Sequence, residues 1–353
     1  MLPYWFLFLV PAFAALSERS RGGLLRSRFD LPWLLIWSLL TVLVGLRYKV
    51  GGDWGSYERI FRFSSYLTFD DALLRNDPGY ILLNWFAAKA GFDIALVNVV
   101  CAAVFAWGLV AFAREQPRPW LAIAVAVPYL VTVVAMGYSR QGVAIGFAML
   151  ALTGLGANST VRFVIWIGIA ALFHKTAVLL LPIAILSTTE SRLWTFLWVG
   201  CIGLLLYYLL LAESVEELIE NYVVAGYQSQ GAAIRVTMNA LPAAVFLLYR
   251  RHFRLEGAEL KLWTYISLGA LGFVVLLFVL PSSTAVDRMA LYLIPVQIFV
   301  LSRLPSAWQA RYRAGETVKV GVIAYSALVL FVWLNFAAHA RYWLPYQTVL
   351  FSG

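Results

Sequence analysis

Charged residues are scarce in this chain of 353 residues. Asp, Glu, Lys and Arg together make up 13% of it, whereas 62% of the residues are hydrophobic. A water-soluble domain carries about a quarter charged residues and about half or fewer apolar ones. The composition therefore excludes a water-soluble enzyme, a nucleic-acid-binding domain and a disordered scaffold. The net charge of +9 does not indicate a nucleic-acid partner, because basic residues in a membrane protein collect on cytoplasmic loops.

Cysteine is almost absent as well. Cys101 and Cys201 are the only two, each within an apolar run, which excludes a disulfide framework and a cysteine metal site. We expect both to be small core residues. The sequence also lacks metal-ligand spacings, nucleotide-binding glycine loops and internal repeats. It predicts neither a metal ion nor a cofactor, and a single domain over residues 1–353.

Long apolar runs dominate what is present. A bilayer-crossing helix needs about 17–25 mostly apolar residues, and the sequence predicts an all-α integral membrane protein with about twelve such helices (range 10–13). The expected spans are 2–16, 31–46, 93–113, 120–138, 141–157, 161–173, 176–188, 193–212, 236–250, 262–281, 289–304 and 318–337. Residues 80–91 are too short to cross and predict an interfacial or re-entrant helix.

The basic residues assign the loops to two sides. Placing 17–30, 114–119, 158–162, 189–192, 250–261 and 303–319 in the cytoplasm puts 16 of the 27 Lys and Arg residues there and leaves 11 outside. This asymmetry follows the positive-inside rule and puts both chain ends outside. It also requires residues 161–188 to form a hairpin with His174 at its outer tip.

Two longer loops, 47–79 and 213–235, fall on the outer side. Tyr57, Ile60, Phe61, Ser64 and Leu67 have helical spacing in the first loop. Val215, Leu218, Ile219 and Tyr222 have it in the second. Both patterns predict amphipathic helices that lie on the periplasmic membrane surface.

Unusual polar residues gather on this same outer side. Basic residues stand in short connections between apolar segments, where an ionisable group is expensive and indicates a functional site. They are Arg47, Arg140, Lys175, Arg235, Arg288 and Arg341. Five outer segments carry the polar groups: 47–57, 76–80, 138–142, 173–175 and 287–289.

These residue types predict glycosyl transfer from a lipid-linked pyrophosphate sugar. Guanidinium groups bind phosphoryl oxygens bidentately, and a carboxylate can act as general base on a sugar hydroxyl. Aromatic rings suit the apolar faces of sugars; the candidates are Trp54, Tyr57, Tyr80, Tyr222 and Tyr227.

Each central residue also has a structural interpretation. Asp53 could form an Asx-turn, and Arg140 could extend to lipid headgroups. His174 could be an interhelical hydrogen-bonding group, and Asp287 and Arg288 could form a local ion pair. Gly142-x-x-x-Gly146 predicts close helix packing.

At these residues the chain resembles the EpsG family of bacterial exopolysaccharide membrane proteins, which are regarded as Wzy-like polymerases. The resemblance covers about residues 40–346. It is carried by Arg47 through Tyr57, Asp77-x-Gly79-Tyr80, Ser139-Arg140-Gln141, Phe173-His174-Lys175, Asp287-Arg288 and Tyr342-Trp343-x-Pro345-Tyr346. The resemblance implies a multi-pass protein of the bacterial inner membrane that joins repeat units carried on undecaprenyl pyrophosphate at the periplasmic face.

We assign roles on that basis as hypotheses. Arg140 and Arg288 bind the donor pyrophosphate, and Asp53 is the first choice of general base, with His174 second. We expect the facing cations to lower the pKa of Asp53, which would weaken it as a base. The remaining substrate-binding candidates are Arg47, Lys49, Trp54, Tyr57, Asp77, Tyr80, Gln141, Lys175, Tyr227, Arg235, Asp287 and Arg341.

The expected partners are the undecaprenyl-pyrophosphate-linked glycan and the lipid bilayer. A chain-length regulator or other polysaccharide-assembly proteins are candidate partners, and nucleic acid is not. Two alternatives stay open: another polyprenyl-linked transferase, such as a ligase or single-sugar transferase, and a transporter or flippase of lipid-linked sugar.

Overall fold

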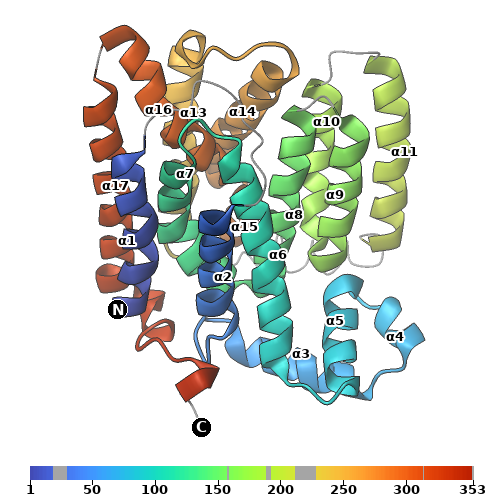
Figure 1. Ribbon diagram of the computed structural model, residues 1–353. Helices are drawn as coiled ribbons and strands as arrows, with labels where there is room; N and C mark the ends of the chain where they lie inside the picture. Colours follow the sequence, from blue (N-terminus) through green and yellow to red (C-terminus); the bar gives the residue numbers. More distant parts are fainter. Residues whose placement is uncertain (19–29, 157–158, 188–191, 211–227, 313, 352–353) are drawn as a thin grey trace.

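The chain folds as a bundle of helices in the computed structural model (Figure 1). The structure describes residues 1–18, 30–156, 159–187, 192–210, 228–312 and 314–351. Within these ranges the regular structure is helical, apart from an isolated antiparallel bridge between Arg47 and Thr348. The all-helical part of the fold prediction is confirmed.

Every predicted span coincides with helix. The corresponding elements are α1 (Leu2–Ser17), α2 (Leu31–Gly45), α6 (Ile94–Arg114), α7 (Pro119–Ala126) with η1 (Val127–Ala135), α8 (Ser139–Gly156), α9 (Thr160–Phe173), η2 (Lys175–Leu180) with α10 (Leu181–Ser187), α11 (Arg192–Leu210), α13 (Ala232–Tyr249), α14 (Gly257–Val279), α15 (Ser283–Ala290) with η6 (Leu291–Leu293) and α16 (Pro295–Tyr312), and α17 (Gly315–Phe336). The helix starts follow local chemistry, since α1, α2 and α7 each have proline in the first turn, where no amide hydrogen bond is lost.

Fewer helices are clearly able to cross a membrane than were predicted to cross. In the described residues, four are long and apolar enough: Ile94–Arg114, Ala232–Phe253, Gly257–Val279 and Gly315–Phe336. A fifth forms if Ser283–Leu293 and Pro295–Gln309, which are bent by 46° to each other, count as one broken span. The chain is thus a membrane protein with four to five clearly membrane-capable helices, and the count of twelve stays a prediction.

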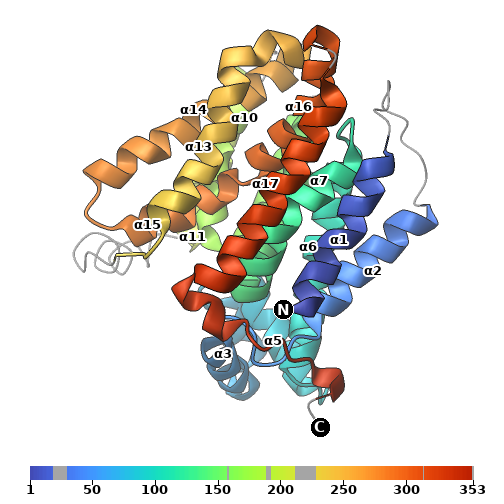
Figure 2. The ribbon, with the colours of Figure 1, turned by 90° about the vertical axis from the view of Figure 1, so that its left-hand side faces the viewer.

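The connections sort to the two ends of the bundle. Both chain termini lie at the lower end of Figure 1 with α3 (Trp54–Tyr66), α4 (Phe69–Leu73) and α5 (Pro78–Lys89). At the opposite end, Arg118, before α7, contacts Glu18 and Glu316, which join it to α1 and α17. Figure 2 shows α13 and α14 as a tilted pair beside α16 and α17. Described residues of three loops that the charge count assigns to one side, 17–30, 114–119 and 303–319, thus meet at the end of the bundle opposite the termini.

The hairpin predicted within 161–188 is present. The chain turns at His174, and η2 and α10 then pack back against α9. His174 lies at the tip, outside both apolar segments, and the amide of the next residue, Lys175, donates to Asp77 at the start of α5.

The predicted short helices are only partly described. The pattern in loop 47–79 forms α3, which buries Trp54, Tyr57 and Ser64, and the 80–91 stretch forms α5. The second pattern, 215–222, lies outside the described residues. Their position on a membrane surface stays a prediction.

Glycine brings α6 and α8 into close contact. A Cβ on Gly146 would lie 2.7 Å from the Cα of Phe105 in α6. One on Gly142 would lie 3.0 Å from the Cα of Ala135, so Gly142 packs closely against the end of η1. The expected close packing is confirmed. Cys101 is buried as expected, but Cys201 is exposed, so its assignment to the core was wrong: an apolar run does not tell which side of a helix faces the bundle.

Candidate active site

Five segments that are distant in sequence meet at the lower end of the bundle. They are the loop into α3, the start of α5, the start of α8, the turn after α9, and α15. Glycine permits two of the approaches. Gly51 has φ +108° and would place a Cβ 2.7 Å from the carbonyl oxygen of Met136, whereas a Cβ on Gly79 would meet Leu172 at 3.0 Å.

Asp77 joins three of these segments. It has φ +55° in the left-handed region at the start of α5. Its Oδ2 accepts a hydrogen bond from Nη1 of Arg140 (2.7 Å), and its Oδ1 accepts one from the amide of Lys175 (3.0 Å). Asp77 is therefore an anchor that holds the start of α8 beside the turn after α9.

The guanidinium of Arg140 is only partly enclosed by its protein partners. Besides Asp77, its guanidinium contacts the hydroxyl of Tyr57 and lies 6.0 Å from the ring centre of Tyr80. A third of the Arg140 side chain (34%) remains exposed, so the ion pair leaves part of the guanidinium accessible to a ligand. This partnership differs from the alternative in which Arg140 extends to lipid headgroups.

Arg288 projects from α15 without a carboxylate partner. Its guanidinium carbon lies 5.9 Å from the ring centre of Tyr138, and no described residue forms an ion pair with it. Its backbone oxygen accepts a hydrogen bond from Nε2 of Gln141 (2.6 Å). This bond joins the backbone of α15 at Arg288 to Gln141, the residue that follows Arg140 in α8.

Asp53 lies near both arginines. It precedes α3, but its side chain does not cap that helix, and its carboxylate makes no hydrogen bond or ion pair among the described residues. The Asx-turn alternative is therefore wrong. Arg288 and Arg140 are both near enough to act on its ionisation.

Burial raises the pKa of Asp53 above its ordinary value, although Arg288 and Arg140 act to lower it. Our expectation of a lowered pKa was wrong because the loss of solvent around the carboxylate outweighs attraction to the cations. A raised pKa makes Asp53 a stronger base once it is ionised.

His174 is the fourth predicted catalytic residue at this end of the bundle. Its Nδ1 lies 2.7 Å from Oγ1 of Thr176 and 3.1 Å from the hydroxyl of Tyr292. Burial, together with Arg140, Arg288 and Lys175, lowers the pKa of His174 to about 3. The ring is therefore neutral at physiological pH, and the four predicted catalytic residues lie in one cluster.

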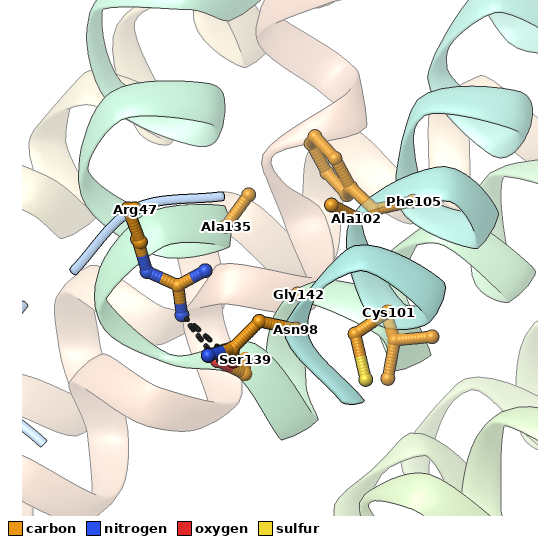
Figure 3. Close-up of a pocket in the computed structure, with 9 residues that line it drawn as sticks. Arg47, Asn98, Cys101, Ala102, Phe105, Ala135, Ser139 and Gly142 are labelled. Carbon is orange, nitrogen blue, oxygen red and sulfur yellow. Dashed lines mark hydrogen bonds between the residues drawn. The ribbon is translucent and has the colours of Figure 1, made fainter. Parts of the chain in front are cut away.

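Arg47 lies behind this cluster. Its side chain is 1% exposed, and its guanidinium donates to the Val44 carbonyl, to Oγ of Ser139 (2.6 Å) and to Oδ1 of Asn98 (3.4 Å). Figure 3 shows Arg47, Ser139 and Asn98 meeting between their segments. The arginine ties the loop of Asp53 to the first residue of α8, next to Arg140.

Asp287 pairs with Arg235 and not with its neighbour Arg288. Nε and Nη2 of Arg235 donate to the two carboxylate oxygens of Asp287 at 2.7 and 2.6 Å. Ser229 also donates to Asp287 (3.1 Å). The local ion pair considered from the sequence is wrong, and the Arg235–Asp287 bridge holds α15 against α13.

The other candidates are either exposed residues that do not contact the site cluster or buried residues packed around it. Lys49 is exposed and lies over the ring of Tyr48, and Arg341 is exposed and donates to the Tyr342 hydroxyl. Tyr57, Tyr80 and Trp54 are buried, so their rings form wall and not an open sugar platform. Tyr227 lies outside the described residues.

Sequence reasoning gave no role to three residues of the site: Tyr138, which it named only as part of segment 138–142, Thr176 and Tyr292. Tyr138 and Thr176 are close in sequence to Arg140 and His174, and that proximity was the available signal. Tyr292 lies at the bend between α15 and α16 and has no local signal. In the described part of the chain, no group of three or more His, Cys, Asp or Glu residues could hold a metal ion.

Comparison with known proteins gives one match. The model of the EpsG family matches residues 30–348. No curated protein and no solved structure matches the chain.

Proposed function

The chain belongs to the EpsG family, and on that premise we propose that it is a membrane glycosyltransferase of the polysaccharide-polymerase type. It joins undecaprenyl-pyrophosphate-linked oligosaccharide repeat units at the periplasmic face of a bacterial inner membrane, in exopolysaccharide or capsule biosynthesis. The observation that carries the proposal is the Asp53 carboxylate, which has no hydrogen-bond or ion-pair partner among described residues and lies near Arg140 and Arg288.

The donor diphosphate binds between the two arginines. Arg288 has no described carboxylate partner, and Arg140 keeps part of its guanidinium accessible beside Asp77. Lys175 adds positive charge to the same cluster. Positive charge that is already in place where the pyrophosphate leaves stabilises the transition state, because the protein does not have to rearrange during the reaction.

Asp53 activates the acceptor. Its carboxylate takes the proton from a sugar hydroxyl of the acceptor unit, and that oxygen forms the new bond to the anomeric carbon of the donor. The bond from this carbon to the pyrophosphate oxygen breaks, and undecaprenyl pyrophosphate leaves with the electron pair. The raised pKa of Asp53 suits a base for this step.

The test is product analysis with purified protein in lipid nanodiscs and a defined lipid-linked repeat unit. We expect a ladder of products longer than two units. A single transfer step to a second lipid or sugar would support the ligase or single-sugar transferase, and movement of the intact lipid across vesicles without bond formation would support the flippase. Either result overturns the polymerase proposal.

The outward orientation has its own test. In a variant with Cys101 and Cys201 replaced by alanine, a cysteine at exposed Lys49 should react in intact cells of a Gram-negative host with a thiol reagent that passes the outer membrane but not the inner one. A cysteine at exposed Arg251, at the opposite end, should not. The reverse labelling would place the site in the cytoplasm and contradict the proposal.

A further inference from the structure

Two hydroxyl groups, one on half-buried Thr176 and one on buried Tyr292, lie next to one ring nitrogen of His174. Oγ1 of Thr176 is 2.7 Å and the hydroxyl of Tyr292 is 3.1 Å from Nδ1. The two hydroxyls also contact each other, and Tyr292 is 3% exposed. The three groups come from the turn after α9, from η2 and from η6, between α15 and α16.

The hydrogen bonds of this cluster favour one position for the imidazole hydrogen. If Nδ1 accepts, the Thr176 hydroxyl donates to Nδ1 and the Tyr292 hydroxyl donates to Thr176 or to Nδ1, so both donors are used. If Nδ1 carries the hydrogen and donates to the nearer Thr176 hydroxyl, Thr176 donates to Tyr292, and the hydrogen of the buried Tyr292 hydroxyl has no acceptor among the described residues. An unsatisfied buried donor costs about 1–3 kcal/mol, which favours Nδ1 as the acceptor.

In a neutral imidazole the hydrogen must then be on Nε2. The nearby Arg140, Arg288 and Lys175, with burial, oppose a second proton on the ring. Nε2 makes no hydrogen bond with any described residue. The ring therefore offers one N–H donor next to Lys175, whose amide donates to Asp77, the carboxylate that pairs with Arg140. An anion is expected beside these cations.

We propose that His174 is a neutral hydrogen-bond donor whose Nε2–H binds an oxygen of the diphosphate held by Arg140 and Arg288, and that Thr176 and Tyr292 are positioning residues that fix this tautomer. This inference rests on the proposed function. It removes His174 as the second choice of base and leaves Asp53 as the base. It also gives Thr176 and Tyr292 a role in the reaction.

The tautomer is measured directly by nitrogen NMR of 15N-histidine-labelled protein in nanodiscs. His252→Gln and His339→Gln remove the two other histidines, which lie away from the site. Near neutral pH we expect an unprotonated Nδ1 and a protonated Nε2. Tyr292→Phe and Thr176→Val should each mix the two tautomers, whereas Tyr325→Phe on α17 should change nothing.

Activity separates a donor from a base. His174→Gln keeps an N–H donor and should stay within about tenfold of the parent rate, whereas His174→Ala should lose about a hundredfold or more. The acid limb of the pH–rate profile should be the same in His174→Gln, because that limb belongs to Asp53. If His174→Gln and His174→Ala lost the same amount of activity, and the acid limb of the pH–rate profile disappeared, His174 would be the base.

The NMR result and the activity result test the two proposals separately. A protonated Nδ1 or a doubly protonated ring overturns this inference even if the product ladder forms. Absence of any glycosyl transfer overturns the proposed function, while the NMR experiment still reports the tautomer.

Discussion

The two ends of the bundle differ in how completely their charged residues are paired with one another. At the end away from the site, Glu316 accepts from Arg118 (3.1 Å) and from Lys319 (2.6 Å), and Arg303 pairs with Glu259 (2.9 Å). At the site end, Asp53 and Arg288 lie near each other, yet neither has an ion-pair partner in the described structure. Contacts that are complete within the protein hold helices together, whereas unpaired charges leave room for a ligand.

The site end also contains complete pairs, and their location sharpens the contrast. Asp77 with Arg140 and Asp287 with Arg235 lie directly beside the open charges. Each pair fixes a segment that carries an unpaired or partly paired group: α8 in the first case and α15 in the second. Rigid pairs thus keep the open charges in place before substrate binds, which is what catalytic preorganisation requires.

The largest expected effect is at Asp53. Asp53→Asn keeps the shape but removes the base, and should lower the polymerisation rate about 10²–10⁴-fold, measured by product length and rate in nanodiscs. Asp70→Asn, at an exposed carboxylate on α4, is the control and should change nothing. A normal ladder from Asp53→Asn would remove Asp53 from the mechanism.

The same variant should not lose stability. Because the folded pKa of Asp53 is raised, the folded state binds more protons than the unfolded state between the two pKa values, so stability falls as pH rises through that window. At neutral pH the ionised carboxylate is therefore a net penalty. Asp53→Asn should unfold at the same or a higher temperature in detergent, and a clear drop would indicate a structural role.

A pair of arginine variants tests the contrast between the ends. Arg288→Gln should reduce activity about 10²–10³-fold with little change in unfolding temperature. Arg118→Gln should destabilise by up to about 1 kcal/mol, since its partner Glu316 is 69% exposed and an exposed ion pair contributes about that much, with normal activity per folded molecule. If Arg288→Gln lost stability and Arg118→Gln lost activity instead, the difference between the two ends would be contradicted.

The Arg235–Asp287 bridge predicts a smaller, reversible effect. Asp287→Asn leaves a largely enclosed arginine without its carboxylate and should cost about 2–4 kcal/mol, with reduced activity as Arg288 shifts. Exchanging the two residues, with Arg235→Asp and Asp287→Arg together, should recover part of the stability in a thermal unfolding assay. No recovery would mean that the bridge itself is not what holds α15.

The effect that is smallest near neutral pH concerns His174. The pKa of His174 is about 3 in the folded chain against an ordinary 6.5, so between these values the unfolded chain binds the extra proton. Stability from this group is fully present above about pH 6.5 and declines as pH falls toward 3. His174→Gln should flatten that part of the unfolding profile, whereas His252→Gln should leave it unchanged.

Some of the site was predictable from sequence. Asp53, Arg140, His174 and Arg288 belong to separate outer segments, and alternation of membrane spans predicts that such segments meet at one end. That reasoning needs only apolar lengths and loop charges. It does not need the side-chain partners.

Those partners were not predictable. Asp287 could have paired with its neighbour Arg288, but it bonds Arg235, 52 residues away, because α13 packs beside α15. Arg47 was expected at the outer face and is enclosed against Asn98 and Ser139. Tyr292 reaches His174 across 118 residues, and no local pattern indicates such a contact.

The amino-acid sequence alone determined that this is a helical membrane protein with its unusual polar segments at one end, because apolar length and loop charge act locally on each segment. Only the tertiary structure decided which charges are neutralised, which stay open and which way the pKa of Asp53 moves. Those outcomes depend on distances of a few ångströms between helices and on how much water they exclude, and both are properties of the packed bundle.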